Sequence, residues 1–248
     1  MTEETSIPTK LVHLAPRPAG VDQATFMARW QARSERNMTL RAFERFSRYE
    51  HCSTLTTADD PSLPAMLAPD GPGAAYGGVG AASFDGGFAT LAAIAADSRG
   101  AAEDVETFGT DLAPYLLVIH EEVVFDRGGT ELRIYSFLAR QPQLSLDEFA
   151  EQWRAFIDTF LAHEELTRHC SAYVQDHVLA PEPAAAPMFD GIAEMGFRSV
   201  EDVVSFLSEP ALVEELFPAE EPFIDRSRGL VLLTRPTVLS ARAGAPSA

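Results

Sequence analysis

Cysteine is scarce in this chain of 248 residues, which contains only Cys52 and Cys170. The two lie at non-equivalent positions of an internal repeat described below, so we expect neither a disulfide nor a thiolate metal pair. The first ten residues, MTEETSIPTK, are acidic and polar, so we expect no secretory leader. We therefore expect a cytoplasmic protein.

Positive charge is equally scarce. Lysine and arginine total 19 against 37 for aspartate and glutamate, which gives a formal net charge of −18. Such a charge repels phosphate backbones and anionic lipid surfaces. No apolar run approaches the roughly 20 residues that cross a bilayer. Neither nucleic acid nor a membrane is therefore expected as a partner.

The familiar cofactor motifs are absent as well. The segment GGVG at residues 77–80 lacks the G-x-G-x-x-G spacing of a dinucleotide site, and no P-loop or G-x-S-x-G elbow occurs. His163 begins HEELT, where Thr167 replaces the second histidine of the H-E-x-x-H zinc pattern. We expect no cofactor, and metal binding by the acidic runs stays the alternative.

What the chain does contain is a tandem repeat. The pattern of strand, polar turn, amphipathic helix and second strand over residues 131–177 recurs, in degraded form, from residue 10. The matching aromatic residues are Phe26 and Phe149, Trp30 and Trp153, and Tyr49 and Tyr173. We therefore expect two domains, at residues 10–127 and 131–240.

Each repeat is expected to fold as βαββαβ. The predicted first helices follow Asp22 and Ser145 as N-caps, with Glu148 completing a capping box in the second. The remaining predicted elements are third strands at 76–84 and 189–197, second helices at 88–96 and 200–207, and last strands at 115–119 and 230–233. This is the α+β ferredoxin-like pattern, a four-stranded antiparallel sheet with helices on one face. Two such sheets are expected to cover each other as an intramolecular α/β-barrel.

The same features carry a family resemblance. They are the F-x-x-x-W helix, the strand from Tyr173 to His177, the segment FDGIAEMGF and the late run EEPFIDRSRGLVLLTRPTVL. The chain resembles the EthD-like family of the dimeric α/β-barrel superfamily, with two copies in tandem. The resemblance implies a pocket for small, often aromatic or polyketide-derived ligands. It also implies cofactor-free cyclase, dehydratase or decarboxylase activities.

The first half departs from the family pattern. Asp190 and Glu194 of the second half are replaced by Gly77, Gly80 and Ala81 in the first. The helix histidine often seen in the group is missing from both halves.

A candidate catalytic set lies on the second strand of the second half. Tyr173, Gln175 and His177 share one face of that strand. Because Ala172 and Val174 suit helix contact, we expect the polar set to point away from the helices, into the barrel. The alternative is a solvent-exposed histidine and a structural tyrosine.

Asp190 and Glu194 share a face of the next strand and are expected to accompany this set. A histidine that exchanges protons, a carboxylate that orients it and a tyrosine that polarises a carbonyl suffice for enolisation, cyclisation or dehydration. His13, His51 and Tyr49 form a similar second set in the first half.

Three hypotheses follow. The leading one is a cofactor-independent acid/base enzyme of lyase, dehydratase or cyclase type, acting on a small hydrophobic, aromatic or polyketide-like carbonyl compound. The alternative is a non-catalytic protein that binds a hydrophobic ligand, or haem through a histidine. The third is a pocket filled by the protein's own side chains. Each sheet has its partner within the chain, so a monomer suffices and a homodimer is the alternative.

Overall fold

The computed structural model describes residues 9–67, 71–84, 101–179 and 188–241. The helix expected at 88–96 lies outside these residues. The chain forms two compact units. The first consists of Met1–Thr54, Ala75–His120 and Pro236–Pro246. The second consists of Leu55–Ala74, Glu121–Arg235 and Ser247–Ala248. The two compact units differ from the expected domains, residues 10–127 and 131–240, in the assignment of three segments, residues 55–74, 121–127 and 236–240. The expected domain boundaries therefore stay a prediction.

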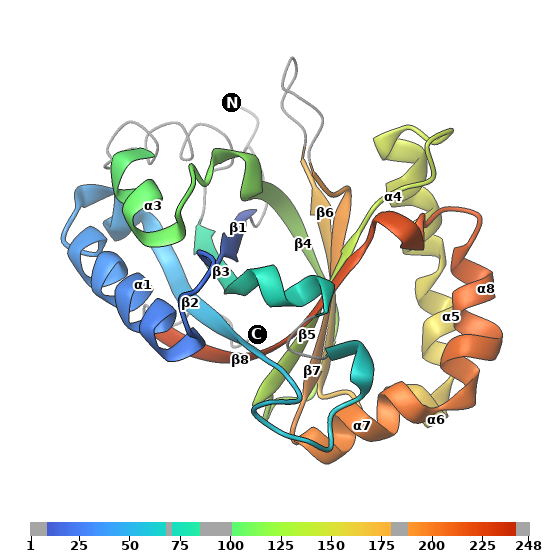
Figure 1. The fold of residues 1–248 in the computed structure, drawn as a ribbon. Coiled ribbons are helices and arrows are strands. Elements are labelled where there is room, and N and C mark those ends of the chain that lie inside the picture. The colour runs from blue at the N-terminus through green and yellow to red at the C-terminus, as the bar shows by residue number, and fades with distance from the viewer. Residues whose placement is uncertain (1–8, 68–70, 85–100, 180–187, 242–248) are drawn as a thin grey trace, which may run out of the picture. The chain divides into compact units, whose positions relative to one another are not determined.

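The first unit is built on an antiparallel sheet with the order β4-β1-β3-β2. Its strands are β1 (Thr9–Pro16), β2 (Phe46–Leu55), β3 (Tyr76–Phe84) and the start of β4 (Leu116–Asp126). Its helices are α1 (Gln23–Asn37) and α3 (Ala101–Phe108) (Figure 1). Phe26 and Trp30 of α1 pack with Phe108 of α3 over one face of the sheet.

The second unit repeats this plan with the strand order β8-β5-β7-β6. Its strands are β5 (Leu132–Leu138), β6 (Ala172–Val178), β7 (Gly191–Phe197) and β8 (Leu230–Ala241). Its helices are α4 (Leu146–Ala155), α5 (Ile157–Ala162), α6 (Glu164–Thr167), α7 (Val200–Ser208) and α8 (Phe217–Glu220), with a π-helical turn at Leu212–Leu216. The buried face of α4, formed by Phe149 and Trp153, belongs to the main apolar core of this unit.

The first helix of each unit begins where its capping residue predicts. The Asp22 carboxylate accepts a hydrogen bond from the Thr25 amide at 2.9 Å. Ser145 and Glu148 form a complete capping box, with the Ser145 amide donating to the Glu148 carboxylate at 2.7 Å. Both expected helix starts are confirmed.

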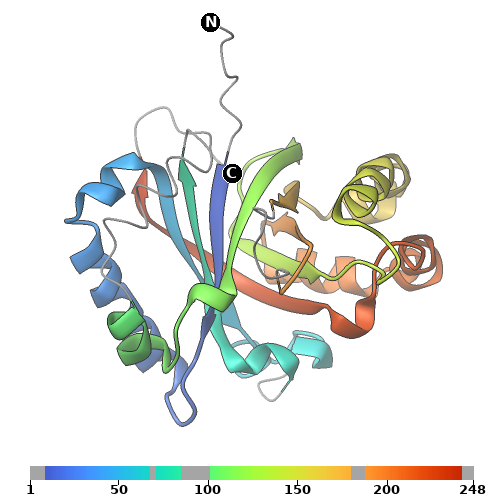
Figure 2. The ribbon, with the colours of Figure 1, turned by 90° about the horizontal axis from the view of Figure 1, so that it is seen from above.

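The last strand of each repeat is longer than predicted. β4 continues to Asp126 and β8 to Ala241, well beyond the apolar cores expected at 115–119 and 230–233. The extensions carry charged and exposed residues, which a strand tolerates where one face meets water. Figure 2 shows β8, in red, as one continuous strand.

The eight strands are hydrogen-bonded in the order β1-β3-β2-β8-β5-β7-β6-β4, and this order closes on itself as in a barrel. The expected α+β fold of tandem ferredoxin-like repeats is confirmed. None of the helices in the described parts of the chain has the length and apolar character needed to cross a membrane.

One glycine in each unit lets the helix tryptophan approach the sheet. A Cβ at Gly191 would lie 2.6 Å from Cζ3 of Trp153, and one at Gly78 would lie 2.9 Å from Cζ3 of Trp30. Both distances are too short for carbon atoms in contact. The tryptophan of each F-x-x-x-W helix therefore packs against a strand position that has no side chain, because glycine occupies it.

Candidate functional site

The second unit contains a cavity of about 200 Å³ between its sheet and its helices. The sheet side is formed mainly by Ile134, Ser136, Ala193 and Met195, and the helix side mainly by Trp153, Phe156, Phe160, Phe206, Leu212 and Leu216. Most of these side chains are apolar, which is typical of small-molecule sites. The π-helical turn contributes two of them, and such turns often occur at functional sites.

Tyr173 supplies a polar group within this apolar lining. Its hydroxyl accepts a hydrogen bond from Nε2 of Gln175 at 3.2 Å, and the same nitrogen donates to the Trp153 carbonyl at 3.0 Å. Burial raises the pKa of Tyr173 to about 12. The hydroxyl is therefore protonated at neutral pH and can donate a hydrogen bond to a ligand oxygen.

Two charged residues also line the cavity. Glu220 of α8 and Arg226 form an ion pair, and the Arg226 guanidinium lies 3.6 Å from the centre of the Phe217 ring. Burial lowers the pKa of Arg226 to about 10, so this side chain stays charged at neutral pH.

The orientation expected for the second strand is wrong. Tyr173, Gln175 and His177 face the helices, as shown by the bond from Gln175 to the Trp153 carbonyl and by the packing of Tyr173 on Phe160, with ring centroids 4.6 Å apart. Bulky aromatic side chains fill the helix layer here. Because Gly191 on the neighbouring strand has no side chain, Trp153 lies close to the sheet, where its backbone carbonyl accepts the hydrogen bond from Gln175.

His177 has a different carboxylate partner from the one expected. Its ring lies 4.8 Å from that of Trp153, and its Nε2 is 3.5 Å from Oε2 of Glu122 on β4. It does not line the cavity that contains Tyr173. Glu122 belongs to the acidic pair Glu121-Glu122, and no sequence pattern predicted its contact with His177.

Glu194 lies on the opposite face of the sheet, because it pairs with Tyr135 of β5 and Val174 of β6. There its carboxylate is 3.5 Å from the buried Arg133 guanidinium, which also donates to the Tyr135 hydroxyl at 2.7 Å. The expected grouping of Glu194 with Tyr173 and His177 is therefore wrong.

Asp190 is held outside strand β7. Its carboxylate accepts a hydrogen bond from the Arg140 amide at 2.8 Å and pairs with the Arg140 guanidinium. This contact anchors the loop that follows β5. Asp190 does not line the cavity and does not orient His177.

The second predicted set is partly brought together in the first unit. Nε2 of His51 lies 2.9 Å from Oγ of Ser34 and 3.0 Å from the Tyr49 hydroxyl, and the His51 ring stacks on Trp30 at 3.8 Å. His13 lies 5.5 Å from the same tryptophan, between ring centroids. Burial lowers the pKa of both histidines to about 3, so both imidazoles are neutral at physiological pH. Ser34 was missed because a small polar residue within a helix gives no sequence signal.

The side chains of both units also determine which metal ion or cofactor the chain could hold. The described parts of the chain contain no cluster of three or more His, Cys, Asp or Glu side chains positioned to hold a metal ion. Haem requires an axial ligand, most often a histidine. Among the described residues, the lining of the second unit's cavity contains no histidine, so this cavity does not supply the histidine ligand through which haem binding was expected as the alternative.

Residues 141–227, within the second unit, match the EthD domain family. The EthD resemblance predicted for the second half is thereby confirmed. Among curated proteins, none matches the chain.

Solved structures share the fold over nearly the whole chain. An anthrone oxidase-like protein has a TM-score of 0.54 at 10% identity, covering 99% of this chain and 98% of its own. A candidate monooxygenase from Fusobacterium nucleatum has a TM-score of 0.52 at 7% identity, covering 94% of each chain. A candidate chlorite dismutase has a TM-score of 0.50 at 10% identity, covering 94% of this chain and 96% of its own. At these identities the likeness shows the fold alone.

Proposed function

We propose that this chain, whose residues 141–227 match the EthD domain family, binds a small, flat, mainly apolar compound that carries one carbonyl or phenolic oxygen. The observation that carries the proposal is the apolar cavity of about 200 Å³ with the protonated Tyr173 hydroxyl in its lining. Apolar walls favour the ring system, and the hydroxyl selects for an oxygen that accepts a hydrogen bond.

The size of the cavity limits the ligand. An apolar cavity of about 150 Å³ in another protein accommodates benzene. A cavity of about 200 Å³ therefore suits one ring with substituents or two fused rings.

The reaction we propose is a cofactor-independent proton transfer of lyase, dehydratase or cyclase type. Tyr173 donates a hydrogen bond to the ligand carbonyl, which stabilises the negative charge that develops on its oxygen when a proton leaves the adjacent carbon. Glu220 is the carboxylate that lines the cavity and accepts that proton. Oxygenation of a bound aromatic compound is the second candidate, because fold relatives are named as an anthrone oxidase-like protein and a candidate monooxygenase.

Binding is tested by isothermal titration calorimetry with 2-naphthol and naphthalene. We expect 2-naphthol to bind more tightly, and Tyr173→Phe to weaken its binding about five- to tenfold while leaving naphthalene unchanged. Ala193→Leu should exclude both by filling the cavity. Tyr49→Phe, at the equivalent position of the first unit, is the matched control. Equal affinities of wild type and Tyr173→Phe for 2-naphthol would contradict the role of the hydroxyl.

Turnover is tested by hydrogen–deuterium exchange at the carbon beside the carbonyl of 1-tetralone, followed by NMR in D₂O. We expect exchange with the wild type and its loss in Tyr173→Phe and Glu220→Gln. Binding without exchange would favour the non-catalytic ligand-binding protein. An oxidised product formed in air would favour the oxygenase.

A further inference from the structure

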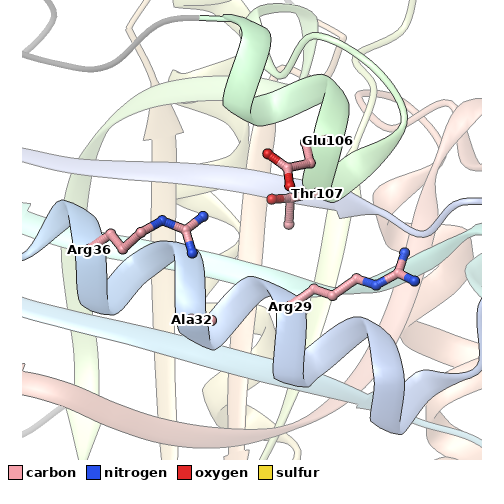
Figure 3. A pocket seen from close by; sticks show the side chains of 5 residues that line it. All are labelled: Arg29, Ala32, Arg36, Glu106 and Thr107. Carbon is pink, nitrogen blue, oxygen red and sulfur yellow. The ribbon is translucent and has the colours of Figure 1, made fainter.

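A second, polar hollow lies on the first unit between α1 and α3. It has a volume of about 390 Å³ and is lined by Arg29, Ala32, Arg36, Glu106 and Thr107. Figure 3 shows both arginine side chains extending from α1 on the side of α3, with Ala32 between them. The small alanine side chain leaves the space between the two guanidinium groups open.

The arginines of α1 divide into two kinds. Arg33 pairs with Asp104 and lies over the Phe108 ring at 5.3 Å, so it joins α1 to α3. Arg29 and Arg36 are exposed, and neither guanidinium has a hydrogen bond or ion pair with any residue that the structure describes. Two turns of helix separate them, which places both on one face.

This arrangement is unusual for so acidic a chain. Acidic side chains outnumber basic ones by 37 to 19, yet the described lining of this hollow contains two arginines and a single carboxylate, that of Glu106. Arginine binds carboxylate and phosphate oxygens through two parallel hydrogen bonds. The hollow therefore offers two such binding groups to one ligand.

Glu106 and Thr107 restrict what that ligand is. The Glu106 carboxylate disfavours a ligand that is anionic throughout and accepts a hydrogen bond from a hydroxyl or ammonium group. The Thr107 hydroxyl adds a neutral hydrogen-bonding group.

We propose that this hollow binds a small organic dianion that also carries a hydroxyl group. Each arginine holds one carboxylate or phosphate group of the ligand, and Glu106 accepts the hydroxyl proton in a hydrogen bond. The site belongs to the first unit and does not depend on the function proposed for the cavity of the second.

The test is isothermal titration calorimetry of the full chain at low ionic strength with L-malate and succinate, which differ only in the hydroxyl group. We expect malate to bind more tightly than succinate. The double variant Arg29→Gln/Arg36→Gln should weaken malate binding at least about tenfold, as expected for loss of two charge-assisted interactions. Glu106→Gln should reduce the preference for malate over succinate.

The matched control is Arg41→Gln/Arg45→Gln, which removes the same charge from exposed positions of the same unit. It should change malate affinity less than twofold. Equal weakening in the two double variants would show that only the overall charge matters and would overturn the proposal. Failure of the wild type to bind either probe would overturn it as well.

Discussion

Tyr173 and Gln175 occupy in the second unit the places that Tyr49 and His51 occupy in the first. In both units the tyrosine hydroxyl is hydrogen-bonded to the side chain two residues later in the strand, at 3.2 Å for Gln175 and at 3.0 Å for His51. The change from histidine to glutamine removes a titratable group from beside the cavity. It leaves Tyr173 as a neutral hydrogen-bond donor whose state does not change near neutral pH.

The buried histidines of the first unit predict a loss of stability in acid. Burial lowers the pKa of His13 and His51 to about 3, below the value near 6.5 of an unfolded chain. Between these values the unfolded state binds more protons, so their contribution is complete above pH 6.5 and falls as the pH falls. From pH 7 to pH 5 each histidine should cost on the order of 2 kcal/mol of unfolding free energy.

Urea denaturation at pH 7 and pH 5, followed by circular dichroism, measures this effect. The wild type should lose more stability than the variant His13→Gln/His51→Gln, which has no such groups to protonate. Equal losses in the two proteins would contradict the prediction.

At the scale of elements, the first helix of each unit depends on its cap. Replacing Ser145 by alanine removes the acceptor for the Glu148 amide and half of the capping box, which should cost about 1 kcal/mol of unfolding free energy. Thermal or urea denaturation measures the difference. Ser208→Ala, at the exposed end of α7, is the control and should stay within about 0.5 kcal/mol of wild type.

The docking of α4 on the sheet predicts a second cost. A methyl group at Gly191 would meet Trp153 at 2.6 Å and Phe149 at 3.2 Å. Gly191→Ala should therefore push α4 away from β7 and lower the unfolding free energy by about 1–3 kcal/mol. An unchanged midpoint in urea would show that the helix shifts without cost.

Elements with a strong local signal were predictable from the sequence. The caps at Asp22 and Ser145 and the strand 76–84 are found where expected, because they depend on neighbouring residues alone. The face of β6 was not predictable, since it depends on a tryptophan from another element and on the glycine that admits it.

The residues of the candidate site also divide into those that the sequence identified and those that only the structure reveals. Tyr173 was identified because it stands in the repeated strand. The carboxylate and guanidinium groups of Glu220 and Arg226 come from a distant segment, and only the folded chain brings them to the same cavity. The contact between Glu122 and His177 has the same cause.

At the scale of the whole molecule, the compact units are not the two halves of the sequence. Leu63 and Leu67 precede the second repeat but belong to the core of the second unit. Leu239 ends the second repeat but packs against the cluster of Phe46, Tyr49 and Phe84 in the first unit. Each half of the chain therefore contains part of the other unit's core.

This exchange predicts that neither half folds alone. Residues 10–127 and 131–240, expressed separately, should show no cooperative thermal transition by circular dichroism, because each lacks buried apolar side chains of its own unit. Expression of both halves together should restore the transition. A cooperative transition in either isolated half would contradict the exchange.

The chain contains two tryptophans, and the fold places one in each unit. Trp30 stacks on His51 at 3.8 Å, whereas Trp153 lines the cavity of the second unit. The protein thus carries its own pair of optical reporters. In a Trp30→Phe variant all tryptophan fluorescence would come from Trp153 in the wall of the cavity. A ligand that enters the cavity would change the wavelength and intensity of this emission without any added label.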